Sequence, residues 1–141
     1  MDMSDIVDIA TSGLRAQRAR MTVTASNIAN AETTRTAAGG PFRRRDPVFE
    51  TKRIGSPFAG TLARKLRAVA VSRIQEDQRD PITRYLPHHP DANEEGYVEF
   101  PNVNLVEEQA NLVSASRGFQ ANLLVMQKVR GMAEALMRIG Q

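Results

Sequence analysis

The residues that could most readily bind a metal ion are His88 and His89, with Asp91 two positions later. Imidazole and carboxylate groups ligate zinc, and a zinc site uses at least three protein ligands. The chain contains two His and no Cys, so it offers neither a third imidazole nor a thiolate. Pro87 and Pro90 flank the histidines and stiffen the turn. We interpret this segment as a structural loop and expect no metal site and no cofactor.

Side chains that could perform acid–base or nucleophilic catalysis lack suitable partners. Ser114 and Ser116 have no His or Lys at a useful spacing. Aromatic residues make up 5% of the chain and Trp is absent, which favours helix–helix packing over a deep substrate pocket. We therefore expect no catalytic residues and no enzymatic activity. The acidic side chains that offer carboxylate pairs are interpreted as solvated charge: Glu94, Glu95, Glu107 and Glu108.

Charge is distributed unevenly along the chain, whose net charge is +3. Residues 35–73 hold ten Lys/Arg against two acids, and residues 74–108 hold two Arg against nine acids. The two halves are either solvated surfaces that differ in sign, or an interface through which copies dock head to tail. The candidate charged docking surface consists of Arg43, Arg44, Arg45, Glu94 and Glu95.

Elements that could position such surfaces are read from the apolar periodicity, which is seven residues near both ends. The N-terminal series is Val7, Leu14, Met21 and Ile28, with Ala10, Gln17, Thr24 and Ala31 three positions later. The C-terminal series is Leu105, Leu112, Phe119, Met126 and Ala133, with Glu108, Ala115, Asn122, Val129 and Leu136 three positions later. This is the spacing of helices that pack as a coiled coil.

The sequence between the two helical patterns is rich in Gly and Pro and predicts loops with short strands. One strand is expected near Val48–Lys52, a second within residues 64–75, and a short pairing strand over Gly96–Phe100. We thus predict three regions: an N-terminal helix of the inner core domain (1–34), a loop/β middle region (35–100) and a C-terminal helix of the inner core domain (101–141). The fold class is mainly α with a small β-containing middle, and the two terminal helices pack on one another.

The two helices are too long to bury their apolar positions against so small a middle region. We predict that they pack together and that further copies cover what remains exposed. The predicted interface residues are Leu14, Met21, Asn27, Ile28, Asn30, Leu105, Leu112, Phe119, Met126, Val129 and Leu136.

Targeting signals are not evident in the sequence. No apolar run approaches the roughly 20 residues of a membrane-spanning helix. The first five residues are acidic and no signal-peptide h-region follows them. We expect that the chain either stays in the cytoplasm or is exported by a route that reads no Sec signal.

Several segments resemble a known family. Residues Ser12–Gln17 (SGLRAQ) and Ala25–Thr34 (ASNIANAETT) are similar to the N-terminal signature shared by flagellar rod, hook and related axial proteins. Residues His89–Asn104 (HPDANEEGYVEFPNVN) resemble a stretch of the proximal-rod members. Residues 105–122 and 135–140 resemble the C-terminal helix of the same family. The resemblance covers about half of the chain and leaves residues 35–85 unaligned.

The resemblance implies a structural subunit of the proximal rod of the bacterial flagellar basal body. Such subunits are exported unfolded by the flagellar type III export apparatus, without a cleaved Sec signal. They polymerise within the periplasm through their terminal helices, and the rod transmits torque. The implied partners are other copies of the chain and the neighbouring rod proteins FlgB, FlgF and FlgG, with FliE as a further partner. Neither nucleic acid nor a membrane span is implied.

The basic segment leaves one alternative open. Arg43–Arg45, with Lys52, Arg53, Arg64, Lys65 and Arg67, could attract phosphate groups. The chain would then be a cytoplasmic nucleic-acid-binding regulator. Phe42 is the only aromatic residue beside the Arg triplet, and no stacking motif or recognition helix is evident.

Overall fold

The computed structural model describes residues 3–54 and 66–139. The elements follow the order α1 (Met3–Ala29), β1 (Arg45–Arg53), β2 (Arg67–Glu76), β3 (Ile82–Tyr85), β4 (Tyr97–Phe100) and α2 (Leu105–Ile139). This confirms the predicted fold class of two terminal helices around a small β-containing middle. Arg64 and Lys65 of the basic segment lie outside the described residues, as do residues 1–2 and 140–141 at the ends of the two predicted helical regions.

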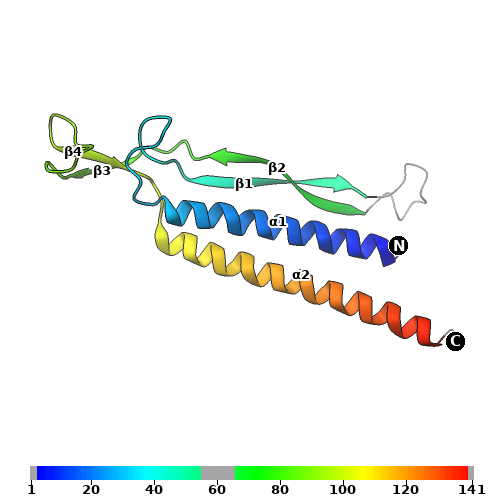
Figure 1. The fold of residues 1–141 in the computed structure, drawn as a ribbon. Coiled ribbons are helices and arrows are strands. Elements are labelled where there is room, and N and C mark those ends of the chain that lie inside the picture. The colour runs from blue at the N-terminus through cyan, green and yellow to red at the C-terminus, as the bar shows by residue number, and fades with distance from the viewer. Residues whose placement is uncertain (1–2, 55–65, 140–141) are drawn as a thin grey trace.

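The helices and the longer sheet form three layers. Helix α1 packs against α2 on one side and against β1 and β2 on the other (Figure 1). The two helices run antiparallel, so the start of α2 lies beside the end of α1. At the opposite end α2 extends beyond the start of α1 (Figure 1). Helix α1 is therefore the middle layer of the subunit.

Strands β1 and β2 pair antiparallel along their whole length, from Arg45 opposite Glu76 to Arg53 opposite Arg67. The register shifts between Val48 and Phe49, since Val48 pairs with Arg73 and Phe49 with Val71. Such an irregularity bends and twists a two-stranded sheet. Both strands lie close to the predicted positions, although β1 begins earlier than the sequence pattern indicated.

Strands β3 and β4 form a separate two-stranded antiparallel sheet at the far end of the molecule (Figure 1). Their connection turns at Gly96, whose φ of 83° lies in the region that favours glycine. A Cβ at Gly96 would also lie 2.9 Å from the ring of Tyr85. The expected pairing strand is β4, and its partner β3 was not predicted.

Buried apolar residues lie on both helices, on β4 and in the loop that follows α1. The buried apolar residues are Ala10, Ala16, Val23, Phe42, Val98, Phe100, Ala115 and Val129. Most of these side chains are small, which lets the layers approach closely. Among the described residues, neither helix is long and apolar enough to cross a membrane.

Candidate assembly interface

The helix pair is held closely at a point where each helix offers a glycine to the other. The amide of Asn122 lies against Gly13, where a Cβ would be 2.8 Å from Asn122 Oδ1. In the same way, a Cβ on Gly118 would be 3.0 Å from Gln17 Cδ. In both helices the glycine precedes the amide residue by four positions, so the two contacts are reciprocal. Any larger side chain at either glycine has to push the helices apart or displace an amide.

A buried polar cluster joins the end of α1, the start of β1 and the first turn of α2. We call it the Asn27–Arg44–Glu108 cluster. Asn27 Nδ2 donates to Glu108 Oε2 at 2.9 Å and to the carbonyl of Arg45 at 2.8 Å. Its Oδ1 accepts from the N–H of Arg45 at 2.9 Å. Asn27 and Glu108 are each only 1% exposed.

Arg44 supplies the charge that balances the buried carboxylate. Its Nε and Nη2 each lie 2.8 Å from Glu108 Oε1, and its side chain is 11% exposed. Its Nη1 contacts the carboxylate of Asp46. Burial lowers the pKa of the Arg44 guanidinium, but the Glu108 hydrogen bond and the charges of Asp46, Glu108 and Glu107 outweigh it and raise the pKa overall. The cluster is thus an ion pair with its remaining hydrogen bonds satisfied.

The local sequence places Glu108 where it can make these contacts. Asn104 caps α2, because its Oδ1 accepts from the N–H groups of Val106 and Glu107 at 3.1 and 3.4 Å. Its carbonyl accepts from the N–H of Glu108 at 2.9 Å, which closes the first helical turn. A carboxylate in this turn is also favoured by the helix dipole.

The structure brings most of the predicted interface residues to the helix pair. Asn27 and Val129 are buried. The half-buried residues are Leu14, Met21, Ile28, Leu112, Phe119 and Met126. Met126 Sδ accepts a long hydrogen bond from Thr11 Oγ1 at 3.9 Å.

The other three predicted interface residues are not buried between the two helices. Leu105 and Leu136, near the two ends of α2, are 42% and 62% exposed. Asn30 bonds within its own turn, donating to the Ser26 carbonyl at 2.9 Å and accepting from Thr33 Oγ1 at 3.2 Å.

The five residues of the charged docking surface do not lie together. Arg44 is turned inward to Glu108, whereas Arg43 is exposed and its Nη1 donates to the Asp77 carbonyl at 3.3 Å. Arg45 is half-exposed and pairs with Glu76 at 3.0 Å. Glu94 and Glu95 are exposed and sit near the β3–β4 sheet. Arg44 is therefore not available to a partner.

The interpretation of Glu108 as solvated charge is wrong. Sequence reasoning placed Glu108 at an interface position of the seven-residue pattern but judged it by its residue type. Gly13 and Gly118 were also missed as contact residues. Their signal is the shared spacing of four residues between each glycine and an amide residue, Gln17 or Asn122, at an interface position.

Comparisons with known proteins match both ends of the chain. The family described as "Flagella basal body rod protein" matches residues 8–35. The family described as "Flagellar basal body rod FlgEFG protein C-terminal" matches residues 94–139. These ranges contain nearly all of α1, the β4 strand and α2.

Full-length relatives extend the match across the middle region. The chain is 37% identical to the "Flagellar basal-body rod protein FlgC" of Borreliella burgdorferi, covering 100% of this chain and 99% of the relative. It is 38% identical to the FlgC of Escherichia coli O6:H1, with both chains covered completely. The FlgC of Bacillus subtilis is 37% identical, with 96% of each chain covered. The chain belongs to the FlgC family of flagellar basal-body rod proteins.

This membership confirms the resemblance read from the two end segments. It also removes support from the nucleic-acid alternative, because the relatives are named as rod proteins. The structure agrees for the Arg triplet, since Arg44 points inward and Arg45 is paired with Glu76. As in other rod proteins, the expected role is structural and not enzymatic.

Proposed function

We propose that the chain is a structural subunit of the flagellar basal-body rod that polymerises through its two terminal helices. The observation that carries this proposal is the large apolar surface of α2 that its own subunit leaves uncovered. Helix α1 covers one side of α2 along its length, and the start of β1 with the preceding Arg44 approaches only the first turns of α2. The exposed apolar side chains of α2 are Leu105, Val106, Val113, Leu123, Leu124, Val125, Met132, Leu136 and Met137.

Three of these side chains form a stripe on the side of α2 that faces away from α1. Val113 follows Val106 by two helical turns, and Leu124 follows Val113 by three turns. The exposed fraction is 76% for Val106, 51% for Val113 and 58% for Leu124. Burying such a side chain contributes about 1.5–3 kcal/mol. Large apolar side chains that stay exposed along one helix face are typical of a protein–protein contact, and neighbouring subunits are the partners that rod assembly supplies.

The end of α2 offers a second uncovered apolar surface. Since Gly13 contacts Asn122 and Asn27 contacts Glu108, the antiparallel register continues to Met3 opposite Met132. The turns of α2 beyond that point extend past α1 (Figure 1). They carry Leu136 and Met137, which are mostly exposed. In an assembled rod these turns would pack against helices of adjacent subunits.

The finer assignment also follows the family. The proposed location is the proximal rod within the periplasm, where the subunit transmits torque and contacts FlgB, FlgF or FlgG and FliE. Export would use the flagellar type III apparatus and no cleaved Sec signal. Regions 1–34 and 101–141 would build the inner layer, and region 35–100 would select the neighbouring subunit. The match of both end segments to rod-protein families supports this assignment.

The proposal is tested by charging the uncovered stripe without touching the α1–α2 contact. Val113→Asp and Leu124→Asp alter side chains that are exposed in the subunit, so stability should change by no more than about 0.5 kcal/mol. Each variant would be produced in cells that lack the wild-type gene. We expect the variant to be expressed and folded, but the cells should be non-motile and should lack complete rods. Basal bodies would be isolated and inspected by electron microscopy.

The matched control is Gln78→Asp, which adds the same charge at an exposed position outside both helices. It should support normal motility. Leu112→Asp and Phe119→Asp, which lie between α1 and α2, should lower both stability and rod incorporation. Normal rods built from Val113→Asp and Leu124→Asp together would refute assembly through this face of α2.

A further inference from the structure

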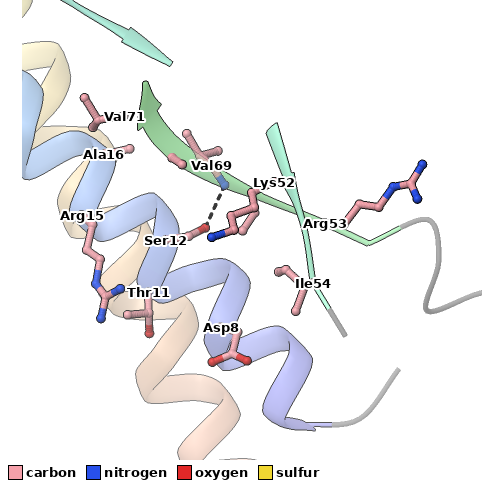
Figure 2. A pocket seen from close by; sticks show the side chains of 12 residues that line it. Asp8, Thr11, Ser12, Arg15, Ala16, Lys52, Arg53, Ile54, Val69 and Val71 are labelled. Carbon is pink, nitrogen blue, oxygen red and sulfur yellow. Dashed lines mark hydrogen bonds between the residues drawn. The ribbon is translucent and has the colours of Figure 1, made fainter. Parts of the chain in front are cut away.

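Two surfaces of opposite charge lie at opposite ends of the β region. The first is a groove of about 660 Å³ between α1 and the β1–β2 sheet. Figure 2 shows its lining side chains, which come from the N-terminal half of α1 and from the two strands. Ala16, Ala68 and Ala70 contribute small apolar side chains to its lining. The hydroxyl of Ser12 accepts a hydrogen bond from the Val69 N–H at 3.1 Å, which joins α1 to β2 beside the groove (Figure 2). The groove is therefore formed before any partner arrives.

The charges around this groove are mostly positive. Arg15, Lys52 and Arg53 line it, with Asp8 as the single acid. Lys52 extends from β1 toward α1, and Arg53 points away from the helix (Figure 2). Within the described residues, none of the three cations forms an ion pair. These cations remain available to a partner that carries carboxylates.

The second surface lies on the β3–β4 sheet and is aromatic and mainly acidic. The cations close to it are engaged elsewhere, since Arg84 lies over the ring of Phe100 and Arg35 pairs with Asp91. Tyr85 and Tyr97 pair across the strands with ring centroids 5.3 Å apart, and they are 63% and 45% exposed. They are the only two Tyr in the sequence. The carboxylates nearby are exposed and make no ion pair with any residue that the structure describes: Glu94, Glu95 and Glu99. Exposed tyrosines are characteristic of protein interfaces.

The two surfaces cannot meet within one subunit, because the full length of the β1–β2 sheet separates them (Figure 1). A contact between them would join two copies through different patches. Such a head-to-tail contact leaves each new copy with a free surface, so it extends an assembly and does not close it. Complementary charge would fix the orientation of the incoming copy.

We infer that the β3–β4 end of one copy, presenting Tyr85, Tyr97 and Glu99, docks at the basic groove of a second copy between α1 and the β1–β2 sheet. This inference rests on the proposed function and adds to it a contact outside the helices. The tyrosine rings would cover the small apolar side chains of the groove, and the carboxylates would pair with Lys52 and Arg53.

Cross-linking tests the contact directly, because the chain has no native Cys. In the double variant Val71→Cys/Glu94→Cys, which keeps both tyrosines, a short bis-maleimide linker should join oligomers of the full-length protein into a ladder. A mixture of the two corresponding single-Cys variants should give only a dimer that contains one chain of each variant. The control pair Val71→Cys/Gln78→Cys, with one position outside the acidic surface, should give no ladder.

Reciprocal charge reversal provides the second test. Lys52→Glu/Arg53→Glu should weaken self-association by about tenfold or more in sedimentation equilibrium at low salt, and so should Glu95→Lys/Glu99→Lys. All four changes in one chain restore opposite charges across the contact and should recover most of the association. A folding defect would instead become worse when the changes are combined.

The outcomes separate this inference from the proposed function. Oligomers that depend on Val113 and Leu124 but give neither the ladder nor the charge rescue would overturn the head-to-tail contact and leave helix-driven assembly intact. A wild-type chain that stays monomeric at every concentration would overturn the head-to-tail contact between copies, whereas the proposed function fails only if Val113→Asp and Leu124→Asp build normal rods. The ladder together with the rescue would establish the contact.

Discussion

The two helices have similar seven-residue patterns but very different surroundings. Helix α1 buries Ala10, Ala16, Val23, Thr24 and Asn27, because α2 covers one side and the β1–β2 sheet covers another. Helix α2 is longer, yet of its residues 105–138, whose burial the structure describes, only Glu108, Ala115 and Val129 are buried. The difference shows that an apolar helix position does not by itself predict burial within the subunit. Helix α1 buries its apolar positions within one subunit, whereas α2 keeps apolar side chains exposed that other subunits can cover.

The largest effect should come from Glu108, a charged side chain of α2 that is fully buried. Glu108→Ala removes the carboxylate that accepts from Asn27 and is the buried counter-ion of Arg44, so the buried guanidinium keeps only the exposed carboxylates of Asp46 and Glu107. We expect a loss of about 3–5 kcal/mol in the free energy of unfolding, measured by urea denaturation.

The double variant Arg44→Met/Glu108→Leu is the control for this prediction. It removes both charges and should be more stable than Glu108→Ala, because no unpaired charge remains. If Glu108→Ala unfolds at the same urea concentration as the wild type, the cluster does not stabilise the helix pair.

A smaller effect should distinguish a covered glycine from an uncovered one. Gly13→Val places methyl groups against the amide of Asn122 and should cost about 1–3 kcal/mol through overpacking. Gly131→Val meets no atom within 4 Å and should stabilise α2 by roughly a few tenths of a kcal/mol, since Val favours a helix more than Gly does. Thermal unfolding followed by circular dichroism would measure both. Equal changes in the two variants would contradict the close approach at Gly13.

The smallest effect concerns an exposed ion pair, the counterpart of the buried one. The guanidinium and the N–H of Arg79 bond to the Asp77 carboxylate and hold its pKa below the usual value of 3.8. The folded state therefore binds this proton less readily than the unfolded chain does. The stabilisation is complete above the unfolded pKa and is lost as the pH falls through the lower folded pKa.

Asp77→Asn should accordingly lower the melting temperature slightly at pH 6 and by less at pH 3. High salt should also shrink the difference at pH 6, because an exposed pair is screened. A difference that grows as the pH falls would contradict the assignment of this pKa shift to Arg79.

The sequence pattern was sufficient to predict both helices, their packing and the approximate positions of three strands. Seven-residue spacing is a local property, and it placed Leu112, Phe119 and Met126 on the side of α2 that packs against α1. It could not show which parts of α2 a single subunit leaves uncovered. That depends on the length of α1 and on the position of the sheet, neither of which the pattern of α2 encodes.

The polar cluster was also missed by the sequence pattern, because its residues are distant from one another in the chain. Arg44 and Glu108 lie 64 positions apart in the sequence, and no periodicity links them. Taken alone, each is a charged residue of a type that is usually exposed to solvent. One local signal was available for Arg44: in extended chain, side chains alternate between faces, so Arg44 cannot share a surface with both Arg43 and Arg45.

The cluster has a consequence for the order in which the subunit folds. Asn27 and Glu108 are 81 positions apart, so their hydrogen bond forms only after the end of α1, the β1 segment and the start of α2 have come together. Contacts of such long sequence separation are slow to form, since the closure entropy of the intervening chain precedes the gain. Neither end of the chain can therefore complete its core while the other is absent. A chain that still lacks α2 cannot form the cluster, so the subunit becomes stably folded only after α2 is present.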